Sequence, residues 1–226
     1  MNQYSIIVPI HNEVKSIPNL LNSLDIYIKN GHEVIIIDDG STDGSTNLLR
    51  KNNCIILIKF NRNRGKGFAI QRALEKANHN KIIIFDGDLE LNPGEIYKLM
   101  ILCKNKGINA AMGYRFKTLS PMKSFFNWGN YLFTSFFNIL LKSNHRDILC
   151  CAKSFYLDQI NNYNISSIGF DIDVELSSVL TINNRKKLIP QIYFQYNRRT
   201  IKEGKKLKVS DGWAILKKII KMIQYF

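Results

Sequence analysis

Residues 81–90, KIIIFDGDLE, decide the fold of this chain. Residues 82–85 are all apolar and run without alternation into Asp86-Gly87-Asp88, a pattern typical of a strand that is buried on both faces. Two carboxylates cannot share that apolar environment without compensation, so we expect the strand to deliver Asp86 and Asp88 to an edge of the sheet. Ligands bind at this edge in open α/β sheets. We expect Gly87 to let the backbone turn sharply between the two carboxylates.

The oxygen atoms near this strand end favour a cation. Glu90 adds a third carboxylate to Asp86 and Asp88, and a helix start follows at Asn92-Pro93. Hard oxygen ligands suit Mg²⁺ or Mn²⁺, and Mg²⁺ commonly shares its site with substrate phosphates. A solvated turn is the alternative interpretation of Asp-x-Asp. The third carboxylate and the helix start favour a metal site instead.

Composition restricts the class of protein. The 226 residues show no linker, repeat or low-complexity tract, so we interpret them as one domain, 1–226. A formal net charge of +14 indicates anionic partners, which include nucleic acid, nucleotide phosphates and a lipid surface. Adjacent Cys150 and Cys151 make a poor disulfide framework, so a reducing compartment is expected. Without a secretory signal or a run of ~18 apolar residues, we expect a cytoplasmic protein that lacks a spanning helix.

Strands and helices alternate along the first half of the chain. Strands are predicted at 5–10, 34–37, 54–60 and 82–85, and helices at 17–28 and 68–77. Ser16 is suited to cap the first helix, and Gly31 to end it. This alternation predicts an α/β fold with a doubly wound, mostly parallel sheet.

Three successive strands end in polar loops that we expect to share one edge of the sheet. Asp39 and Asp43 follow the second strand, where they are suited to hydrogen-bond a ribose or a base. Lys66 lies in the basic loop NRNRGKG, where it and neighbouring backbone N–H groups are suited to meet phosphate at a helix N-terminus. Taken singly, Asp43 is equally well a helix cap and Lys66 a solvated charge. Their placement on successive strand ends favours a nucleotide site.

These motifs together resemble glycosyl transferase family 2, with its GT-A nucleotide-diphospho-sugar fold. The matching stretches, all in the first half, are VPIHNE (8–13), DDGSTDG (38–44), GKG (65–67) and DGDL (86–89). The resemblance implies that Pro9, Glu13 and Asp39 contact the nucleoside and that the carboxylates of Asp-x-Asp bind the metal-diphosphate. His11 stands where the family usually has an aromatic residue, a departure that we expect to alter base stacking.

The second half resembles, more narrowly, the polyprenyl-phosphate (dolichyl-type) sugar transferases. GYR (113–115) follows a predicted strand as that subgroup's Gly-x-Arg does, and DILCCA (147–152) resembles its Asp-x-x-Cys-Gly strand, with Cys151 in place of Gly. YNRR (196–199) and GKK (204–206) resemble its Tyr-x-x-Arg and Ser-Lys pair, with Gly204 in place of Ser. The resemblance divides the chain into a nucleotide-sugar half, 1–115, and an acceptor half, 116–226.

The function expected from this resemblance is that of an inverting, metal-dependent hexosyltransferase. It would move a sugar from a nucleotide-diphospho-sugar to a polyprenyl phosphate at the membrane surface. Because a lipid phosphate is already anionic near neutral pH, no strong base is required. Arg115, Arg199 and Lys205 are expected to position that phosphate, and Asp88 is expected to act with them in catalysis.

Two other functions remain open from the sequence. If the acceptor is a saccharide hydroxyl, a carboxylate base becomes useful, and Asp171, Asp173 and Glu175 are the candidates. A basic nucleic-acid-binding module is the second alternative. We expect no nucleic-acid partner, because the aromatic residues cluster in one apolar helix instead of interleaving with basic residues on strands.

Two segments suggest contact with a membrane. Residues 122–141 are aromatic but interrupted by polar side chains, which favours an interfacial helix that meets a lipid tail over a buried core helix. The C-terminal helix, 213–226, has apolar residues over one half and Lys217, Lys218 and Lys221 on the other. Such a helix either docks on the sheet or lies on an anionic membrane. We expect peripheral attachment to the inner face of the membrane.

Overall fold

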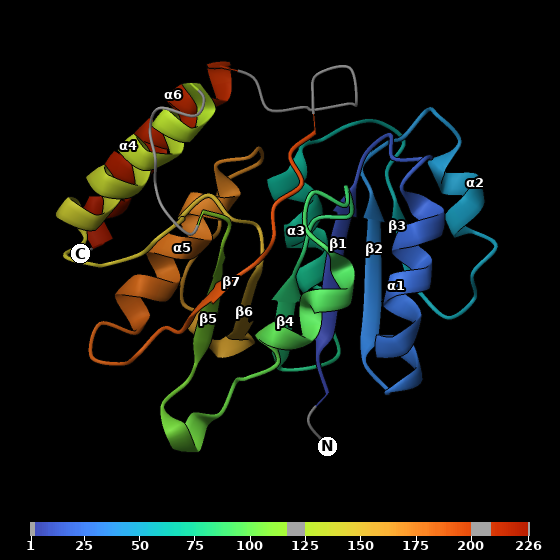
Figure 1. The fold of residues 1–226 in the computed structure, drawn as a ribbon, viewed down its shortest axis with the longest axis horizontal. Coiled ribbons are helices and arrows are strands. Elements are labelled where there is room, and N and C mark those ends of the chain that lie inside the picture. Colours follow the sequence, from blue (N-terminus) through green and yellow to red (C-terminus); the bar gives the residue numbers. More distant parts are fainter. Residues whose placement is uncertain (1–2, 117–124, 200–208, 226) are drawn as a thin grey trace.

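A seven-stranded sheet organises the part of the chain described by the computed structural model, which comprises residues 3–116, 125–199 and 209–225 (Figure 1). The strand order is β3-β2-β1-β4-β6-β5-β7. The strands are β1 (Ser5–Ile10), β2 (Glu33–Asp38), β3 (Ile56–Lys59), β4 (Lys81–Ile84), β5 (Ala110–Tyr114), β6 (Lys153–Tyr156) and β7 (Gln191–Tyr193).

Parallel pairing brings several strand ends to one edge of the sheet. β1 pairs in parallel with β2 and β4, and β2 pairs in parallel with β3. Ile10 lies opposite Asp38, and Ile7 lies opposite Ile84, so the loops after β1, β2 and β4 leave the sheet on the same side. β6 runs antiparallel to β4 and β5, whereas β7 is parallel to β5. The predicted doubly wound, mostly parallel sheet is therefore confirmed.

Helices cover both faces of the sheet because neighbouring side chains in a strand point to opposite faces. On one face Val8 packs in the same core as Leu24 of α1 (Ile17–Lys29). On the other, Ile7 packs with Ile70 of α3 (Lys66–Leu74) and Leu176 of α5 (Ile172–Asn183). These side chains are fully buried, which explains the near-continuous apolar runs of the central strands.

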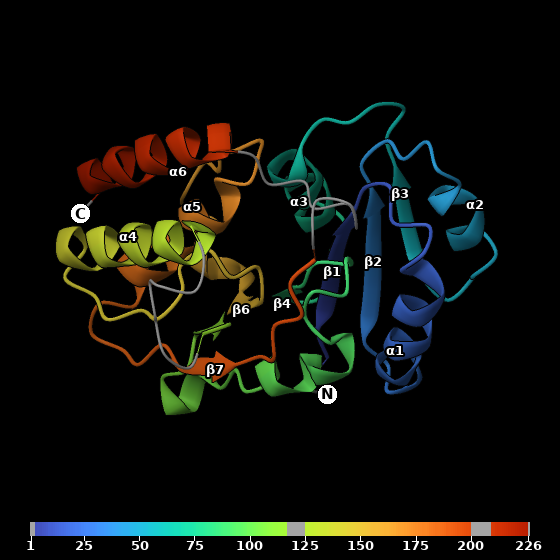
Figure 2. The same cartoon turned by 45° about the horizontal axis from the view of Figure 1, so that its top comes forward.

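A further pair of helices lies outside α5. Figures 1 and 2 show α4 (Phe125–Leu140) and α6 (Val209–Met222) side by side, and both share an apolar cluster with Val174 of α5. Phe137 of α4 is buried, whereas Trp128 and Ile139 are 50% and 75% exposed. α4 thus combines a core face with an exposed apolar face. The remaining elements are α2 (Ser45–Leu49) and the 3-10 helices η1 (Pro93–Leu99), η2 (Lys104–Lys106), η4 (Leu157–Gln159) and η6 (Ile223–Tyr225).

Local structure departs from the sequence predictions at several points. The stretch 147–152 is a turn, and the strand begins only at Lys153. Gly87 does not have a positive φ; a Cβ there would lie 2.5 Å from Ile10 Cγ2, so close packing requires the glycine. The Ser16 hydroxyl does not cap α1 but donates to Glu13 Oε2 at 3.1 Å. The third strand and the helix after it are shorter or earlier than predicted, at Ile56–Lys59 and Lys66–Leu74.

The C-terminal helix differs most from its prediction. Lys218 was placed on a solvated face with Lys217 and Lys221, yet it is only 8% exposed. It shares the buried stripe of α6 with Ile215 and Ile219, because positions three and four apart lie on one face of a helix. The stripe docks on α5 and α4, whereas the predicted alternative was docking on the sheet, and the predicted solvation of Lys218 is wrong.

Candidate active site

Carboxylates from two loops lie close together at the edge of the sheet where the parallel strands β1 and β4 end. Glu13 lies in the loop after β1 and is 4% exposed. Asp86 and Asp88 follow β4, which is the neighbour of β1 in the sheet. Burial of several carboxylates at one edge requires cations close by, since an uncompensated buried charge is costly. Two basic side chains, Lys66 and Arg199, supply them.

Lys66, at the start of α3, joins two carboxylates from different elements. Its Nζ donates to Asp86 Oδ2 and to Asp173 Oδ2, at 2.9 Å in each case. The lysine side chain is 10% exposed. Although burial lowers its pKa, Asp173 and Asp86 hold that pKa well above the ordinary value. Lys66 is therefore a buried, charged link between β4 and α5, and the alternative of a solvated charge is wrong.

Arg199 occupies the centre of the other carboxylates. Its Nη1 and Nη2 donate to Glu13 Oε2 and Oε1 at 2.7 and 3.0 Å, and Nη2 also donates to Asp88 Oδ2 at 3.1 Å. Burial lowers the pKa of the guanidinium, but hydrogen bonding to Glu13 and the charges of Asp88, Glu13 and Glu90 hold it above its ordinary value. A cation from the second half of the chain thus neutralises carboxylates supplied by the first half.

Glu90 fastens the segment that carries Arg199. Its Oε2 accepts from the Tyr196 hydroxyl at 3.0 Å, and its Oε1 accepts from the Arg199 backbone N–H at 3.0 Å. Leu91 and Tyr196 also form an antiparallel bridge. Figures 1 and 2 show this segment, in orange after β7, running toward β1. The contacts give Glu90 an anchoring role that sequence spacing did not reveal.

Asp86 and Asp88 are the carboxylates that best fit a divalent cation. Asp86 Oδ1 is buried and has no hydrogen-bond partner among the described residues. Burial is the largest cause of the raised pKa of both carboxyls, and neighbouring carboxylates add to it, so a bound cation would offset the charge here. Within the described ranges, no three His, Cys, Asp or Glu side chains surround a common metal position. The predicted three-ligand set with Glu90 is therefore not assembled in this structure.

Asp39 and Asp43, two of the carboxylates predicted to lie at the nucleotide site, accept hydrogen bonds from backbone amides of neighbouring loops. Asp39 accepts backbone N–H groups from Arg64 at 2.7 Å and Gly65 at 2.9 Å. Asp43 accepts from the Val14 N–H at 2.9 Å and the Ser45 N–H at 3.0 Å. Burial raises the pKa of Asp43, but hydrogen bonds from the Ser45 hydroxyl and from the Val14 and Ser45 N–H groups bring it below its ordinary value. The geometry favours the structural alternative for Asp43, and the nucleoside contacts stay predictions.

Two further nucleoside candidates lie near the end of β1. Pro9 is a buried strand residue opposite Ile37. His11 is partly exposed in the following loop, with its Nε2 3.3 Å from Asn12 Nδ2. Asn12 has a positive φ of 51° and binds the next loop through its backbone and side chain, at Ser41 and Thr42. His11 therefore lies in the loop after β1, at the shared edge, and its contact with a base stays a prediction.

The N-terminus of α3 is already engaged by the protein. The Gly67 and Phe68 N–H groups both donate to the Ile168 carbonyl, at 2.9 and 3.2 Å. A Cβ on Gly65 would lie 2.2 Å from that same oxygen, so the glycine is what permits this approach. The prediction that backbone amides next to Lys66 meet phosphate is therefore wrong for Gly67 and Phe68.

Three basic residues are predicted to position the acceptor phosphate, and the structure describes two of them, Arg115 and Arg199. Arg115 is held by Asp147, with Nε donating to Oδ2 at 2.7 Å and Nη2 to Oδ1 at 2.9 Å. Asp147 opens the DILCCA stretch, but nothing in the sequence indicated that it pairs with Arg115. Lys205 lies outside the described residues, as does Gly204. The phosphate-positioning roles of Arg115, Arg199 and Lys205 stay predictions.

The three carboxylates considered as a general base lie in different surroundings. Glu175 is fully buried and accepts from the Ser166 and Ser167 backbone N–H groups. Asp171 accepts from the Ser167 hydroxyl at 2.6 Å. Asp173 alone of these three contacts Lys66, and its Oδ1 has no hydrogen-bond partner in the described part of the chain. Lys153 Nζ lies 3.8 Å from that Oδ1, so both oxygens of Asp173 face lysines, and what distinguishes Asp173 among the three is its link to the Asp86 edge through Lys66.

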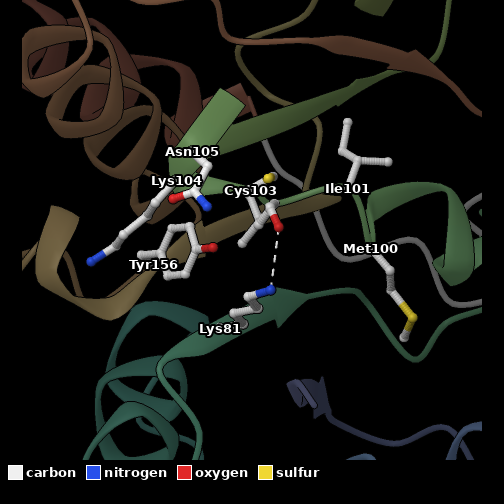
Figure 3. Close-up of a pocket in the computed structure, with 8 residues that line it drawn as sticks. Lys81, Met100, Ile101, Cys103, Lys104, Asn105 and Tyr156 are labelled. Carbon is white, nitrogen blue, oxygen red and sulfur yellow. Dashed lines mark hydrogen bonds between the residues drawn. The ribbon is translucent and has the colours of Figure 1, made fainter. Parts of the chain in front are cut away.

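A separate pocket of about 450 Å³ lies away from this edge (Figure 3). Lys81, at the opposite end of β4 from Asp86, lines it together with Lys104. Both lysines already have partners: Lys81 donates to the Leu102 carbonyl at 3.2 Å, and Lys104 pairs with Asp158 at 2.5 Å. The pocket therefore offers no comparable set of groups for chemistry.

Comparison with known proteins identifies the family. Residues 5–223 match the family described as glycosyl transferase family 2. The chain belongs to glycosyl transferase family 2. Two similar curated members of the family are undecaprenyl-phosphate 4-deoxy-4-formamido-L-arabinose transferases. The protein from Aeromonas hydrophila is 36% identical over 104 residues, covering 42% of this chain and 32% of that protein. The protein from Pseudomonas fluorescens is 34% identical over 104 residues, covering 42% and 31%. The match thus spans about a third of these relatives.

Solved structures confirm the fold of this family 2 chain. Glucosyl-3-phosphoglycerate synthase from Mycobacterium tuberculosis, in complex with UDP, superimposes with a TM-score of 0.76 at 13% identity, covering 98% of this chain and 80% of that one. The same enzyme with Mn²⁺, UDP and glucosyl-3-phosphoglycerate gives 0.76 at 14% identity, again covering 98% and 80%. The predicted GT-A fold is therefore confirmed. In the described ranges, no helix is both long and apolar enough to cross a membrane.

Proposed function

We propose that this family 2 chain transfers a sugar, with inversion, from a nucleotide-diphospho-sugar to a polyprenyl phosphate. The observation that carries the proposal is the contact of Arg199 with Glu13 and Asp88. A guanidinium from the acceptor half lies among the carboxylates of the donor half, so an anionic acceptor would meet the donor there. The undecaprenyl-phosphate transferases that match 42% of the chain support a lipid phosphate as the acceptor.

The donor would bind at the edge formed by β1, β2 and β4. Asp86 and Asp88 would hold a divalent Mg²⁺ or Mn²⁺ ion, and the Mn²⁺ and UDP bound by the solved relative support such a site. When bound, the ion would neutralise charge on the leaving diphosphate. Lys66 fixes the orientation of Asp86 through its 2.9 Å contact. Asp39 shapes the neighbouring loop by accepting from its amides, and this loop would then lie beside the nucleoside.

The chemistry requires an oxygen nucleophile and a stabilised leaving group. A phosphate oxygen of the acceptor attacks the anomeric carbon, and the bond to the nucleoside diphosphate breaks with its electron pair passing to the leaving oxygen. A phosphate monoester has a second pKa of about 6, so this nucleophile is already anionic near pH 7. Arg199 and Arg115 carry the planar forks that bind phosphate oxygens in pairs. Both forks bind carboxylates in this structure, at Glu13 and Asp147, so to position the acceptor and offset repulsion between the two anions they would exchange or share these partners.

A saccharide hydroxyl is the second candidate acceptor, and one observation favours it. Asp173 lies beside the donor edge, because its Oδ2 shares Lys66 with Asp86, while its buried Oδ1 has no hydrogen-bond partner in the described residues and lies 3.8 Å from Lys153 Nζ. Its location would make it the carboxylate that takes a proton from a hydroxyl nucleophile, although the two lysines would weaken it as a base. This acceptor would make Asp173 the base, a role that a phosphate acceptor does not require.

The outer helices suit attachment to an anionic membrane surface. Trp213 and Ile220 of α6 are 67% and 52% exposed, and Trp128 of the adjacent α4 is 50% exposed. Lys217 and Lys221 are exposed on α6. Aromatic and basic side chains together favour binding at the headgroup level of an anionic bilayer. This surface would bring the edge that holds Arg199 close to a lipid-linked phosphate.

A transfer assay with matched acceptors tests the proposal. A panel of nucleotide-sugars is incubated with the chain and Mn²⁺, and sugar transfer is measured to a short-chain polyprenyl phosphate, the same lipid as free alcohol, and simple saccharides. We expect transfer to the lipid phosphate and none to the alcohol. Transfer only to saccharides would reject the lipid phosphate. In that case Asp173→Asn should abolish turnover while donor binding persists.

A further inference from the structure

A buried lysine connects the C-terminal helix to the candidate active site. Lys218 Nζ lies 3.1 Å from Glu175 Oε1 and donates to the Ser166 hydroxyl at 3.0 Å. Asp171 Oδ2 is 3.8 Å from the same nitrogen. Lys218 is 8% exposed and Glu175 is fully buried, so water screens this pair very little. The chain therefore places a desolvated ion pair between α6 and the first turn of α5.

Glu175 connects Lys218 to the loop before α5, because it binds both. Its Oε2 accepts from the Ser167 N–H at 2.7 Å, and its Oε1 accepts from the Ser166 N–H at 3.1 Å and the Tyr163 hydroxyl at 3.0 Å. Burial raises the pKa of Glu175, but these hydrogen bonds and the Lys218 charge bring it below its ordinary value. A charged Glu175 is the stronger acceptor, so Lys218 strengthens its hold on residues 166–169, here called the Ser166 loop.

The Ser166 loop in turn holds the start of α3. The Ile168 carbonyl accepts from the Gly67 and Phe68 N–H groups, and the Ser167 carbonyl accepts from Gln71 Nε2 at 2.8 Å. A Cβ on Gly67 would lie 2.2 Å from Ser167 O, so the two backbones touch without room for adjustment. Lys66 lies at this contact, and its Nζ reaches Asp86 and Asp173. A shift of the Ser166 loop would therefore move Lys66 relative to Asp86.

We propose that Lys218 is a positioning residue for the donor site. Through its ion pair with Glu175 and its hydrogen bond to the Ser166 hydroxyl, it fixes the Ser166 loop against the start of α3 and so keeps Lys66 on Asp86. This positioning role depends on the proposed function in one respect: it takes the edge of the sheet at Asp86 as the site that binds the donor. Misplacement of a binding group by about 1 Å can reduce rates by roughly a hundredfold, so a residue outside the site can matter this much.

The test uses Lys218→Gln, with Lys29→Gln as the matched control. Lys29 also forms a helix ion pair, with Asp25 at 2.5 Å, but its side chain is 71% exposed and lies on α1. Hydrogen exchange of the whole chain is measured first. We expect the Gly67 and Phe68 amides of Lys218→Gln to exchange about ten times faster or more, while amides of β1 and β2 keep wild-type protection. Lys29→Gln should exchange like the wild type throughout.

Kinetics provide the second measurement. We expect Lys218→Gln to raise the KM for the nucleotide-sugar roughly tenfold or more, with the KM for the acceptor unchanged, because the loop acts on the donor edge. Lys218→Arg keeps the charge and should restore most of the loss. If Lys218→Gln does not fold, the double variant Lys218→Gln/Glu175→Gln removes both charges and is measured in its place, with the same expectation.

Two results would overturn the positioning role. The first is wild-type exchange at Gly67 and Phe68 in the variant, together with wild-type donor KM. The second is exchange that rises equally in β1 and β2, which would show that Lys218 only stabilises the fold. A wild-type chain that transfers no sugar would reject the proposed function, and the exchange measurement would still decide this proposal.

Discussion

Arg199 and Glu13 are 186 positions apart in the chain, yet they are joined by two parallel hydrogen bonds of 2.7 and 3.0 Å. The pair closes the carboxyl edge of the sheet by tying the segment after β7 to the loop after β1. Because Nη2 also donates to Asp88, one guanidinium links Glu13, a predicted nucleoside contact, to Asp88, a predicted metal ligand. Any change at Arg199 should therefore affect donor binding as well as acceptor use.

Arg199→Lys tests this linkage. Lysine keeps the charge but loses the planar fork, so it cannot bind Glu13 and Asp88 together. Hydrogen bonds to charged groups contribute about 1.5–3 kcal/mol, which corresponds to a loss of roughly ten- to a hundredfold in kcat/KM. A double-mutant cycle with Glu13→Gln measures the coupling. Strictly additive losses from the two changes would show that the pair does not act as a unit.

The metal assignment is tested at Asp86 and Asp88. We expect Asp88→Asn to abolish Mn²⁺-dependent donor binding in calorimetry, because an amide is a poor ligand for a hard cation. Asp86→Asn should weaken it also and should free Lys66 from one of its two partners. Chelation of the metal should produce the same loss in the wild type. Metal-dependent affinity that survives in Asp88→Asn would move the cation elsewhere.

The edge of the sheet that is proposed to bind the donor was predictable from the sequence, because each of its strands is marked by a local pattern of residues. Apolar runs of β1, β2 and β4 end in polar residues, and parallel strands bring such ends together. The positions of Asp86 and Asp88 follow from those rules alone. Their partners do not, since the contact of Lys66 with Asp173 spans 107 positions and no periodicity encodes it.

The second half was less predictable for the same physical reason. Arg115 meets Asp147, and Tyr196 meets Glu90, through tertiary contacts between irregular segments. One signal was present and was missed. Lys218 stands three residues after Ile215, one before Ile219 and four before Met222, which is the spacing of a buried helix stripe. A lysine at such a buried position requires a carboxylate as its partner, and Glu175 of α5 is that partner.

Two glycines in helices offer a matched test of the contact between α3 and the Ser166 loop. A Cβ on Gly67 would lie 2.2 Å from Ser167 O, whereas a Cβ on Gly129 of α4 would meet only Phe133 Cε2 at 4.0 Å. We expect Gly67→Ala to destabilise the protein by about 1–3 kcal/mol through overpacking. Gly129→Ala should stabilise it by roughly 0.5–1 kcal/mol, as in an ordinary helix interior. Denaturant unfolding measures both, and equal effects would contradict the close contact.

His145 should make stability depend on pH. Burial, aided by Lys153, lowers the pKa of His145 to about 4, and its Nε2 lies 2.8 Å from the Thr181 hydroxyl. The unfolded chain, with an ordinary pKa of about 6.5, binds this proton first as pH falls. The stabilisation is therefore complete above pH ~6.5 and is lost progressively toward pH ~4, by about 3 kcal/mol in all. Below that range this residue should cause no further loss.

The variant His145→Gln isolates this effect from that of the carboxylates. Unfolding free energies of the wild type and the variant are compared between pH 4 and 8, because titration of other groups cancels in the difference. We expect the curve of the variant to be flatter over that window. Parallel curves would show that His145 has the same pKa in the folded and unfolded chains.

Membrane attachment should depend on the exposed face of α6. Lys217 and Lys221 flank the exposed Trp213 and Ile220, and lysines near an anionic surface contribute about 1 kcal/mol each. Removing both charges in Lys217→Gln/Lys221→Gln should therefore lower partitioning to anionic vesicles roughly thirtyfold at low salt. The matched control is Lys51→Gln/Lys76→Gln, which removes two exposed lysines from around α2 and α3. In Figure 1, α2 lies at the far side of the sheet from α4 and α6, and Lys76 follows the C-terminal end of α3, so vesicle binding should remain near that of the wild type.

Salt and lipid composition separate the electrostatic and apolar parts of this attachment. The Debye length falls from about 10 Å at 0.1 M salt to about 3 Å at 1 M, so high salt should weaken, without abolishing, binding of the wild type to anionic vesicles. Trp213→Ala should weaken binding at both salt concentrations, because the loss of an apolar side chain is not screened. Equal binding of the wild type to neutral and anionic vesicles would exclude the lysines as the cause. Retention after a high-salt wash that Trp213→Ala abolishes would instead assign attachment to the apolar face of α6.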